Sequence, residues 1–243
     1  MRVENLFEQA ELTTDSVCLY IGRDGKKKQE NTRVLKEHKM RIVINEIYTL
    51  HIMCTPQYLT EAVLGRLCTE GISDNDNIED IESVYICKDG SLANVKMADP
   101  EWNMPISREM QPVSPSKWKE EWVFRLADIL AEGMPLHKET WGTHSCFLAK
   151  EGEVLFSCED IGRHNAIDKV VGYALLKGIN LKECMLYSSG RMPSDMEEKV
   201  IRAGIPIAVC KAVPTAEAVE LAGKYRLTLI CAARPDRIRV YHA

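Results

Sequence analysis

The fold is decided by residues 184–231, CMLYSSGRMPSDMEEKVIRAGIPIAVCKAVPTAEAVELAGKYRLTLIC. Short apolar runs in this stretch alternate with segments whose apolar residues recur at helical spacing, so strands and helices are expected in turn. Ser194 and Glu197 have the spacing of a capping box, which predicts the start of the first helix. Strand–helix–strand order of this kind is typical of an α/β domain in which helices pack on a sheet. The expected strands are 184–188, 205–211 and 227–231, and the expected helices are 194–203 and 214–223.

The flanking residues extend this pattern into a two-domain α/β protein. Apolar residues on both sides of 150–153 predict a hairpin, and helical spacing that ends at Gly178 predicts a helix after it. The first half has its own strand and helix signals, so we place a boundary near residue 140, between domains 1–139 and 140–243. Further expected elements are hairpins at 41–53, 83–97 and 145–158, helices at 60–71 and 117–132, and a strand at 238–241.

Two segments lack such patterns. Residues 98–116 contain four prolines and few apolar residues, which is typical of a linker or a mobile loop. Ser116 is suited to cap the linking helix that follows, in which Trp118 and Trp122 begin a stripe that we assign to the core. Residues 22–30 are polar and charged, with three consecutive lysines, and are interpreted as a surface turn.

The composition is that of an ordinary globular protein. The 243 residues are 45% hydrophobic and 28% charged, and 31 Lys and Arg against 36 Asp and Glu give a net charge of −5. This slight acidity provides no overall attraction for nucleic acid, and no apolar stretch reaches the ~18 residues that a membrane-spanning helix needs. The first ten residues do not resemble a signal peptide, so we expect a cytoplasmic protein that binds neither nucleic acid nor membrane.

Nine cysteines are present, and in a reducing cytosol they are expected to be free thiols. No two of them have the Cys-x-x-Cys spacing. Cys146 and Cys158 fall on the two strands of one expected hairpin, where we interpret them as small buried hydrophobic residues. No set of His, Cys, Asp and Glu has the spacing of a zinc site, and the His-x-Glu and Pro-Cys-x-x-Cys pattern of zinc deaminases is absent.

Three loops in the second half share one physical feature, which is that each leads from a strand into a helix. The free backbone N–H groups at a helix start favour an anion. Two of the loops add a glycine and an arginine, and arginine donates two hydrogen bonds to a phosphate at once. One such arginine is usually solvated or ion-paired, but three such loops in succession favour a site for a phosphate-bearing ligand. The loops are 159–165, 188–191 and 212–215.

His164 and Asp168 are four residues apart and share one face of the expected helix. An acid–base pair is one interpretation, and a hydrogen-bonded turn at the helix start is the favoured one. Asn165 and Lys169 lie on the adjacent face, where Lys169 would also reach an anion. His144 precedes an expected strand, and we interpret it as structural.

Residues 159–169, EDIGRHNAIDK, resemble the formate dehydrogenase accessory protein family (FdhD/NarQ). Other matching segments follow in the order found in that family, over roughly residues 40–90 and 140–243. They are Thr55-Pro56, Leu64-Gly65, Thr69-Glu70-Gly71-Ile72, His144, Ser189-Gly190-Arg191, Gly204-Ile205-Pro206, Pro214-Thr215-Ala216, Thr228-Leu229-Ile230, Arg234 and Val240-Tyr241.

This resemblance implies a two-domain α/β protein whose larger, C-terminal domain is similar to the cytidine deaminase fold without its zinc. It implies a homodimer that accepts sulfur as a persulfide from a cysteine desulfurase. The sulfur passes to the molybdenum or tungsten form of bis(molybdopterin guanine dinucleotide), the cargo that is inserted into formate dehydrogenase. The family's cofactor-binding stretch corresponds to Ala232, Ala233, Arg234, Pro235, Asp236 and Arg237. With the helix starts, the expected cofactor-binding residues also include Arg163, His164, Asn165, Lys169, Ser189, Gly190, Arg191, Pro214 and Thr215.

One difference from the family concerns the thiol that would carry sulfur. The family usually has a Cys-x-x-Cys on the loop between its two halves, which corresponds here to residues 98–116, and this segment contains no cysteine. A thiolate is the nucleophile that accepts sulfur from a desulfurase. Three functions are therefore considered: a sulfur carrier that uses another cysteine, a chaperone that binds the guanine dinucleotide without carrying sulfur, and, least favoured, a deaminase-like hydrolase. We expect cofactor delivery to formate dehydrogenase, and we assign no catalytic residue.

Overall fold

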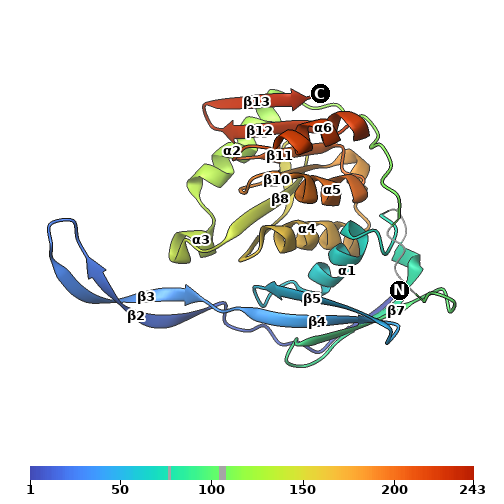
Figure 1. The fold of residues 1–243 in the computed structure, drawn as a ribbon, viewed down its shortest axis with the longest axis horizontal. Coiled ribbons are helices and arrows are strands. Elements are labelled where there is room, and N and C mark those ends of the chain that lie inside the picture. Colours follow the sequence, from blue (N-terminus) through green and yellow to red (C-terminus); the bar gives the residue numbers. More distant parts are fainter. Residues whose placement is uncertain (76–77, 104–107) are drawn as a thin grey trace.

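The computed structural model describes residues 1–75, 78–103 and 108–243 (Figure 1). Within these ranges the chain is a mixed α/β protein with three sheets. The sheet of the second half lies at the top of Figure 1, the sheet of the first half lies below it, and a two-stranded arm extends to the left. Residues 104–107, which belong to the expected proline-rich loop, lie outside the described residues.

The sheet of the second half has the strand order β13-β12-β11-β10-β8-β9. Strands β10, β11 and β12 run parallel, while β8, β9 and β13 are antiparallel to their neighbours. Every residue of β10 and β11 is buried, as expected for parallel strands that are covered on both faces. The strands are β8 His144–Lys150, β9 Glu153–Asp160, β10 Met185–Ser188, β11 Ile207–Cys210, β12 Thr228–Arg234 and β13 Arg237–His242.

Helices cover both faces of this sheet. On one face α4, α5 and α6 contribute apolar residues such as Val170 and Met196 to a common core with the strands. On the other face α2 packs Val123 and Leu126 against Phe147 and Tyr187. The helices are α2 Glu120–Glu132, α3 Pro135–Thr140, α4 Arg163–Lys177, α5 Ser194–Arg202 and α6 Ala216–Tyr225, with a short 3-10 turn at Leu181–Glu183.

The linking helix was expected to begin after Ser116, but α2 begins at Glu120, and its N-cap is Lys119, whose side chain makes no capping hydrogen bond. By its contacts α2 is part of the second sheet's apolar core. The domain boundary near residue 140 stays a prediction.

The sheet of the first half has the order β1-β6-β7-β4-β5, and α1 packs between this sheet and α4 (Figure 1). The two helices cross very closely at Gly65 and Gly172. A Cβ atom at Gly65 would lie 1.7 Å from the carbonyl oxygen of Asp168, and one at Gly172 would lie 1.8 Å from that of Glu61. The elements are β1 Arg2–Asn5, β4 His38–Ile44, β5 Tyr48–Cys54, α1 Leu59–Thr69, a 3-10 turn Ile78–Asp80, β6 Ile81–Ile86 and β7 Leu92–Met97.

The arm is a hairpin of β2 (Thr13–Ile21) and β3 (Lys27–Leu35), and it corrects the interpretation of residues 22–30 as a surface turn. The turn itself is confined to the residues between the strands, and Lys27 begins β3. The hairpin escaped prediction because β3 is polar along most of its length, so it lacks the apolar alternation of a half-buried strand.

Candidate anion-binding site

Four loops meet at one edge of the second sheet. Because β10, β11 and β12 are parallel, the loops that follow them leave the sheet at the same end. His144 at the start of β8 is paired with Asp160 at the end of β9, which brings the start of α4 to that edge as well. The expected residues gathered here are Arg163, His164, Ser189, Gly190, Arg191, Pro214, Thr215 and 232–237.

The loops are held together by two hydrogen bonds between backbone groups and one from a backbone N–H to a side chain. The N–H of Ser189 donates to the carbonyl of Ser145 at 2.9 Å, and the N–H of Ser145 donates to Ser189 Oγ at 2.9 Å. The N–H of Met192 donates to the carbonyl of Val213 at 3.2 Å, which links the loop after β10 to the loop after β11. Gly190 lies against the Arg163 side chain, which a Cβ at this position would meet at 3.7 Å.

The loop after β12 is fixed by a backbone irregularity. Ala232 has a positive φ of 49°, a conformation that residues other than glycine adopt rarely, and it lies in a bulge between β12 and β13. Its N–H donates to the carbonyl of Ala212 at 2.5 Å, and the buried Tyr187 hydroxyl donates to the carbonyl of Ala233 at 2.8 Å. Residues 234–237, which follow the bulge, are exposed.

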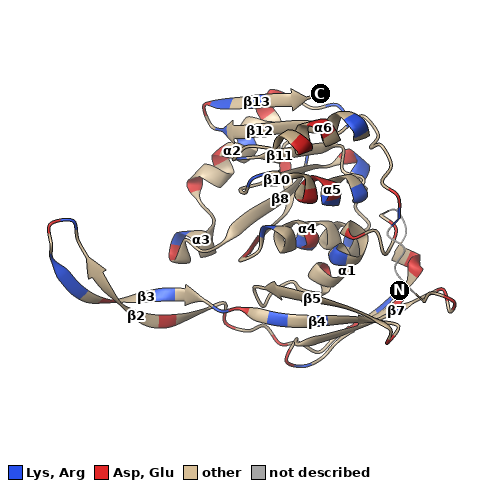
Figure 2. Ribbon diagram, in the orientation of Figure 1, with Lys and Arg blue, Asp and Glu red and all other residues tan. Residues whose placement is uncertain are grey.

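Arginines supply the charge of this edge, on the left of the second sheet in Figure 2. Arg191 and Arg234 are exposed, and neither forms an ion pair with any residue that the structure describes. Arg163 is half-buried, and its Nε is buried without a hydrogen-bond partner among those residues. Only Arg237 is paired, with Asp236 at 3.0 Å. Buried donors without partners are rare in folded proteins, so the arrangement is suited to an anion.

The surroundings of the two histidines of this edge favour their neutral form, because the pKa of each is lowered. Burial lowers the pKa of His144, and the nearby Arg163 guanidinium lowers it further. Burial also lowers the pKa of His164, although Asp195, 3.3 Å from its Nε2, acts in the opposite direction. The positive charge offered to a ligand at this edge therefore comes from the arginines.

Lys169 and Asn165 lie inside the protein and not among these surface loops. Lys169 Nζ donates to Asp160 Oδ2 at 2.5 Å and to the Thr55 hydroxyl and carbonyl oxygens, which uses all three of its protons. The Asn165 amide donates to Asp160 Oδ1 at 2.9 Å and to the carbonyl of Met53. Both residues hold the start of α4 in place through contacts in the protein interior. Lys169 has no free donor for a ligand.

The structure does not bring His164 and Asp168 together. Asp168 accepts hydrogen bonds from Thr69 at 2.6 Å and from Lys199 at 2.9 Å, in a buried network between α1, α4 and α5. His164 instead lies next to Asp195. Both interpretations of the His164–Asp168 spacing are corrected, because α1 packs on the helix face that carries Asp168.

The predicted capping box at the start of α5 is also wrong. The helix is preceded by Pro193 as N-cap, without a side-chain capping hydrogen bond. The carboxyl group of Glu197 is completely buried, and neither oxygen has a hydrogen-bond partner among the described residues. Burial raises the pKa of Glu197 to about 8, so the group is largely protonated at neutral pH.

Seven of the nine cysteines are buried, and all nine are free thiols. Burial raises the pKa of Cys54 and of Cys158 to about 12 and raises that of Cys146 strongly. These thiols stay protonated at neutral pH, which agrees with the interpretation of Cys146 and Cys158 as small core residues. The two half-exposed cysteines are Cys18 on the arm and Cys87 after β6.

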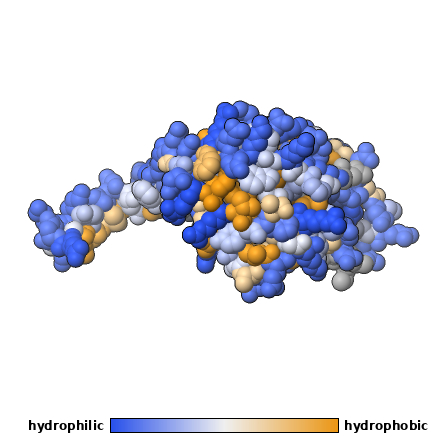
Figure 3. All heavy atoms as spheres, turned by 90° about the horizontal axis from the view of Figure 1, so that it is seen from above, coloured by the Kyte–Doolittle hydropathy of each residue, from blue (hydrophilic) through white to orange (hydrophobic). Residues whose placement is uncertain are grey.

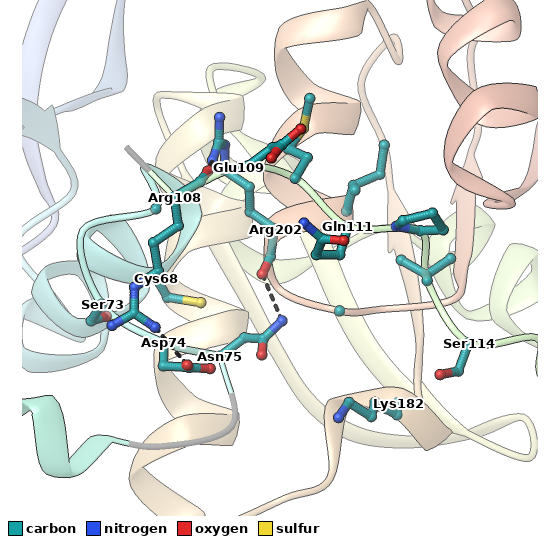
Figure 4. Close-up of a pocket in the computed structure, with 16 residues that line it drawn as sticks. Cys68, Ser73, Asp74, Asn75, Arg108, Glu109, Gln111, Ser114, Lys182 and Arg202 are labelled. Atoms are coloured by element: carbon teal, nitrogen blue, oxygen red, sulfur yellow. Dashed lines mark hydrogen bonds and ion pairs between the residues drawn. The ribbon is translucent and has the colours of Figure 1, made fainter. Parts of the chain in front are cut away.

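A cavity of about 320 Å³ lies at the opposite edge of the second sheet, between the loop after α1 and the segment 108–114 (Figure 4). Arg108 closes one side through ion pairs of 2.5 Å to Asp74 and to Asp80. Cys68 lines this cavity, but burial raises its pKa to about 12. The cavity therefore offers no reactive thiol in place of the missing cysteine pair.

The described residues contain neither a metal-binding cluster nor a membrane-spanning helix. No group of three His, Cys, Asp or Glu side chains is arranged to hold a metal ion within them. None of the helices found there is both long enough and apolar enough to cross a membrane.

The chain is similar in sequence to a known protein family. The model of the FdhD/NarQ family matches residues 35–111 and 101–243. The chain belongs to the FdhD/NarQ family. The sulfur carrier protein FdhD of Listeria monocytogenes serotype 4b (strain F2365) is 27% identical, over 86% of this chain and 88% of the relative. That of Methanothermobacter thermautotrophicus is 28% identical, over 90% of this chain and 92% of the relative.

A solved structure has a similar fold. The crystal structure of a formate dehydrogenase accessory protein from Desulfotalea psychrophila is similar with a TM-score of 0.82. It is 28% identical in sequence, and the match covers 96% of this chain and 98% of that chain. The resemblance stated from residues 159–169 is therefore confirmed, and the mixed α/β fold is that of an FdhD/NarQ protein.

Sequence reasoning found the edge loops but missed the buried network beneath them. Asp160 and Lys169 were recognised as part of one motif, yet their partner Thr55 comes from the first half of the chain. The only signal for this contact is that Thr55-Pro56 and the motif both resemble the family. Spacing along the sequence contains no information about such a distant pair.

Proposed function

We propose that this chain is an accessory protein for formate dehydrogenase maturation that binds bis(molybdopterin guanine dinucleotide), in its molybdenum or tungsten form, at the carboxyl edge of the second sheet. The observation that carries the proposal is the convergence of Arg163, Arg191 and Arg234 at that edge without carboxylate partners among the described residues. The cargo contains pyrophosphate groups, and planar arginine forks are well suited to hold them.

The residues around the arginines would orient the cargo. Backbone N–H groups at the start of α4 and in the loop after β10 add donors for phosphate oxygens. Gly190 allows the backbone to approach a ligand closely, because a side chain there would fill the space beside Arg163. The neutral His144 and His164 would contribute hydrogen bonds and no charge.

Sulfur transfer to the cargo is the part of this role that needs a reactive thiol. A thiolate would attack the outer sulfur of a desulfurase persulfide, forming a new S–S bond and releasing the desulfurase thiolate. Among the cysteines, Cys18 and Cys87 alone are not buried. Cys87 Sγ accepts a hydrogen bond from the N–H of Leu92 at 3.2 Å and donates one to Asp89 at 2.9 Å.

The burial of the other seven thiols supports the second candidate function, a chaperone that binds the cargo without carrying sulfur. Intact mass after incubation with a cysteine desulfurase and cysteine separates the two. A gain of one sulfur that disappears in Cys87→Ser or in Cys18→Ser supports the carrier. No gain, while a relative loaded in parallel does gain sulfur, supports the chaperone.

Complementation tests the accessory role itself. The chain is expressed in a bacterium that lacks its own FdhD gene, and formate dehydrogenase activity is measured. We expect activity to return with the unmodified chain and to be reduced with Arg191→Ala and Arg234→Ala combined. No return of activity, with a bacterial relative as the positive control, would contradict the proposal. A cysteine desulfurase and a second copy of the chain remain expected partners.

A further inference from the structure

Trp141 carries the most exposed large apolar side chain among the residues that the structure describes, at 80% exposure. It is the C-cap of α3, and its φ of 57° is a left-handed conformation that residues other than glycine rarely adopt. A hydrogen bond of 2.7 Å from the Trp141 N–H to the carbonyl of His137 holds the backbone there. A bulky ring that covers no core, on a strained backbone, points to a role other than packing.

The ring lies beside the carboxyl edge of the second sheet. The rings of Trp141 and His137 are edge to face with centroids 5.6 Å apart, and His137 Nδ1 contacts the carbonyl of Thr143 at 2.9 Å. The next residue is His144, whose pKa is lowered by burial and further by the charges of Arg163 and His137. This chain of neighbours leads from Trp141 through His137 and His144 to Arg163.

The loop that carries Arg191 reaches the same corner of the edge. The N–H of Ser189 donates to the carbonyl of Ser145 at 2.9 Å, so this loop runs beside the start of β8, which Trp141 precedes by three residues. In Figure 1, α3 lies at the same end of the second sheet as the turn between β12 and β13, on the left. Trp141, Arg163 and Arg191 are therefore neighbours at one corner.

The family motif itself holds α3 in place. The carboxylate of its first residue, Glu159, is buried and accepts hydrogen bonds from the N–H groups of Leu136 and His137 at 2.8 and 2.6 Å. It also accepts one from the Thr143 hydroxyl at 2.9 Å. Both ends of the segment that contains Trp141 are thus fixed to the strand that leads into α4.

The arm supports α3 from another direction. In Figure 3 the arm extends away from the body of the molecule. At its base Arg33 forms an ion pair of 2.9 Å with Glu139 of α3. A Cβ at Gly142 would lie 2.7 Å from the Leu35 side chain, so the end of β3 packs closely against the residue after Trp141. The exposed ring therefore belongs to an element that its neighbours hold firmly.

We propose that the Trp141 ring stacks on the guanine base of the nucleotide whose diphosphate is held by Arg163 and Arg191, an inference that rests on the proposed function. An indole side chain has only two rotatable bonds, so little freedom is lost when it orders on a ligand. Every base has a π-face, and stacking on an aromatic side chain strengthens binding whatever the base. Trp141 thus adds affinity for the base, while the arginines bind the phosphates.

Calorimetric titration of the full chain with two probes tests the stacking. Guanosine diphosphate carries base and diphosphate, and inorganic pyrophosphate carries the phosphates alone. Trp141→Gly is the test variant and should fold normally, because glycine adopts a positive φ freely and the exposed ring supports no core. We expect it to bind guanosine diphosphate about tenfold more weakly and pyrophosphate with unchanged affinity. Trp141→Phe, which keeps an aromatic face, should retain most of the affinity.

The possible outcomes separate this inference from the proposed function. Unchanged affinity of Trp141→Gly for both probes would overturn the stacking and leave the arginine site intact. An equal loss for both probes would also overturn it, because the ring would then support the phosphate site and not the base. Absence of binding of either probe to the unmodified chain would contradict the arginine site and overturn the inference with it.

Fluorescence gives an independent readout of the same contact. Of the four tryptophans Trp141 alone is exposed, and the other three are partly buried. Guanosine diphosphate should quench the emission of the unmodified chain with a saturating dependence on concentration, and pyrophosphate should not. We expect this quenching to disappear in Trp141→Phe. Quenching of equal size in Trp141→Phe would place the base at another tryptophan and overturn the inference.

Discussion

The Nζ of Lys169 lies 2.5 Å from Oδ2 of Asp160, and both side chains are completely buried. The pair connects α4 to the end of β9, and Thr55 from the first half donates its hydroxyl and its N–H to the same Asp160 oxygen at 3.0 Å. The ionic pair beneath the arginine edge thus also joins the two halves of the chain.

Removal of the Lys169 charge is expected to destabilise the folded protein strongly. Lys169→Met leaves the buried Asp160 carboxylate without its cation, which should lower the free energy of unfolding by about 3–5 kcal/mol. Urea unfolding measures the loss. Lys177→Met, at the exposed end of the same helix, is the control and should change stability by less than about 0.5 kcal/mol. A loss below about 1 kcal/mol for Lys169→Met would mean that hydrogen bonds alone hold Asp160.

The close crossing of α1 and α4 should tolerate no side chain. Gly65→Ala or Gly172→Ala places a Cβ against a backbone carbonyl that cannot move alone, so we expect a loss of about 1–3 kcal/mol or more. Gly223→Ala in α6 is the matched control. Its Cβ would meet the nearest atom at 3.9 Å, and alanine is the better helix former, so stability should rise by about 0.5–1 kcal/mol. Thermal unfolding of the three variants distinguishes crowding from helix propensity.

The burial of Glu197 predicts a specific pH dependence of stability. Its folded pKa of about 8 lies above the ordinary value of 4.5, so between these pH values the folded state holds a proton that the unfolded state has released. Stability from this group is present at the acid end of the window and falls as pH rises, by at most about 1.4 kcal/mol per unit.

Glu197→Gln should remove that slope, and Glu198→Gln should keep it. The two variants are unfolded with urea at several pH values from 5.5 to 8. Contributions of the histidines cancel in the difference between the variants. Parallel curves for the two variants would show that Glu197 has its ordinary pKa and therefore reaches water or a partner.

The strand–helix order of the second half could be predicted because periodicity is a local property. The parallel strands follow from residues 184–231, and their common edge follows from the topology of parallel sheets. The partners of Asp168 and Lys169 could not be predicted, because Thr69 and Thr55 belong to the first half, about a hundred residues earlier in the chain. The β2–β3 arm was missed because β3 covers no core and is polar along most of its length, so it lacks the pattern of a half-buried strand.

Binding of guanosine diphosphate tests the central claim most directly, since this probe carries the guanine and diphosphate of the expected cargo. We would titrate the unmodified chain, Arg191→Ala, Arg234→Ala and Lys177→Ala by calorimetry. We expect one site per chain, affinity about 1–3 kcal/mol weaker in each arginine variant, and no change for Lys177→Ala. Equal affinity in all four proteins, or no binding where an FdhD relative binds the probe, would contradict a cofactor site at this edge.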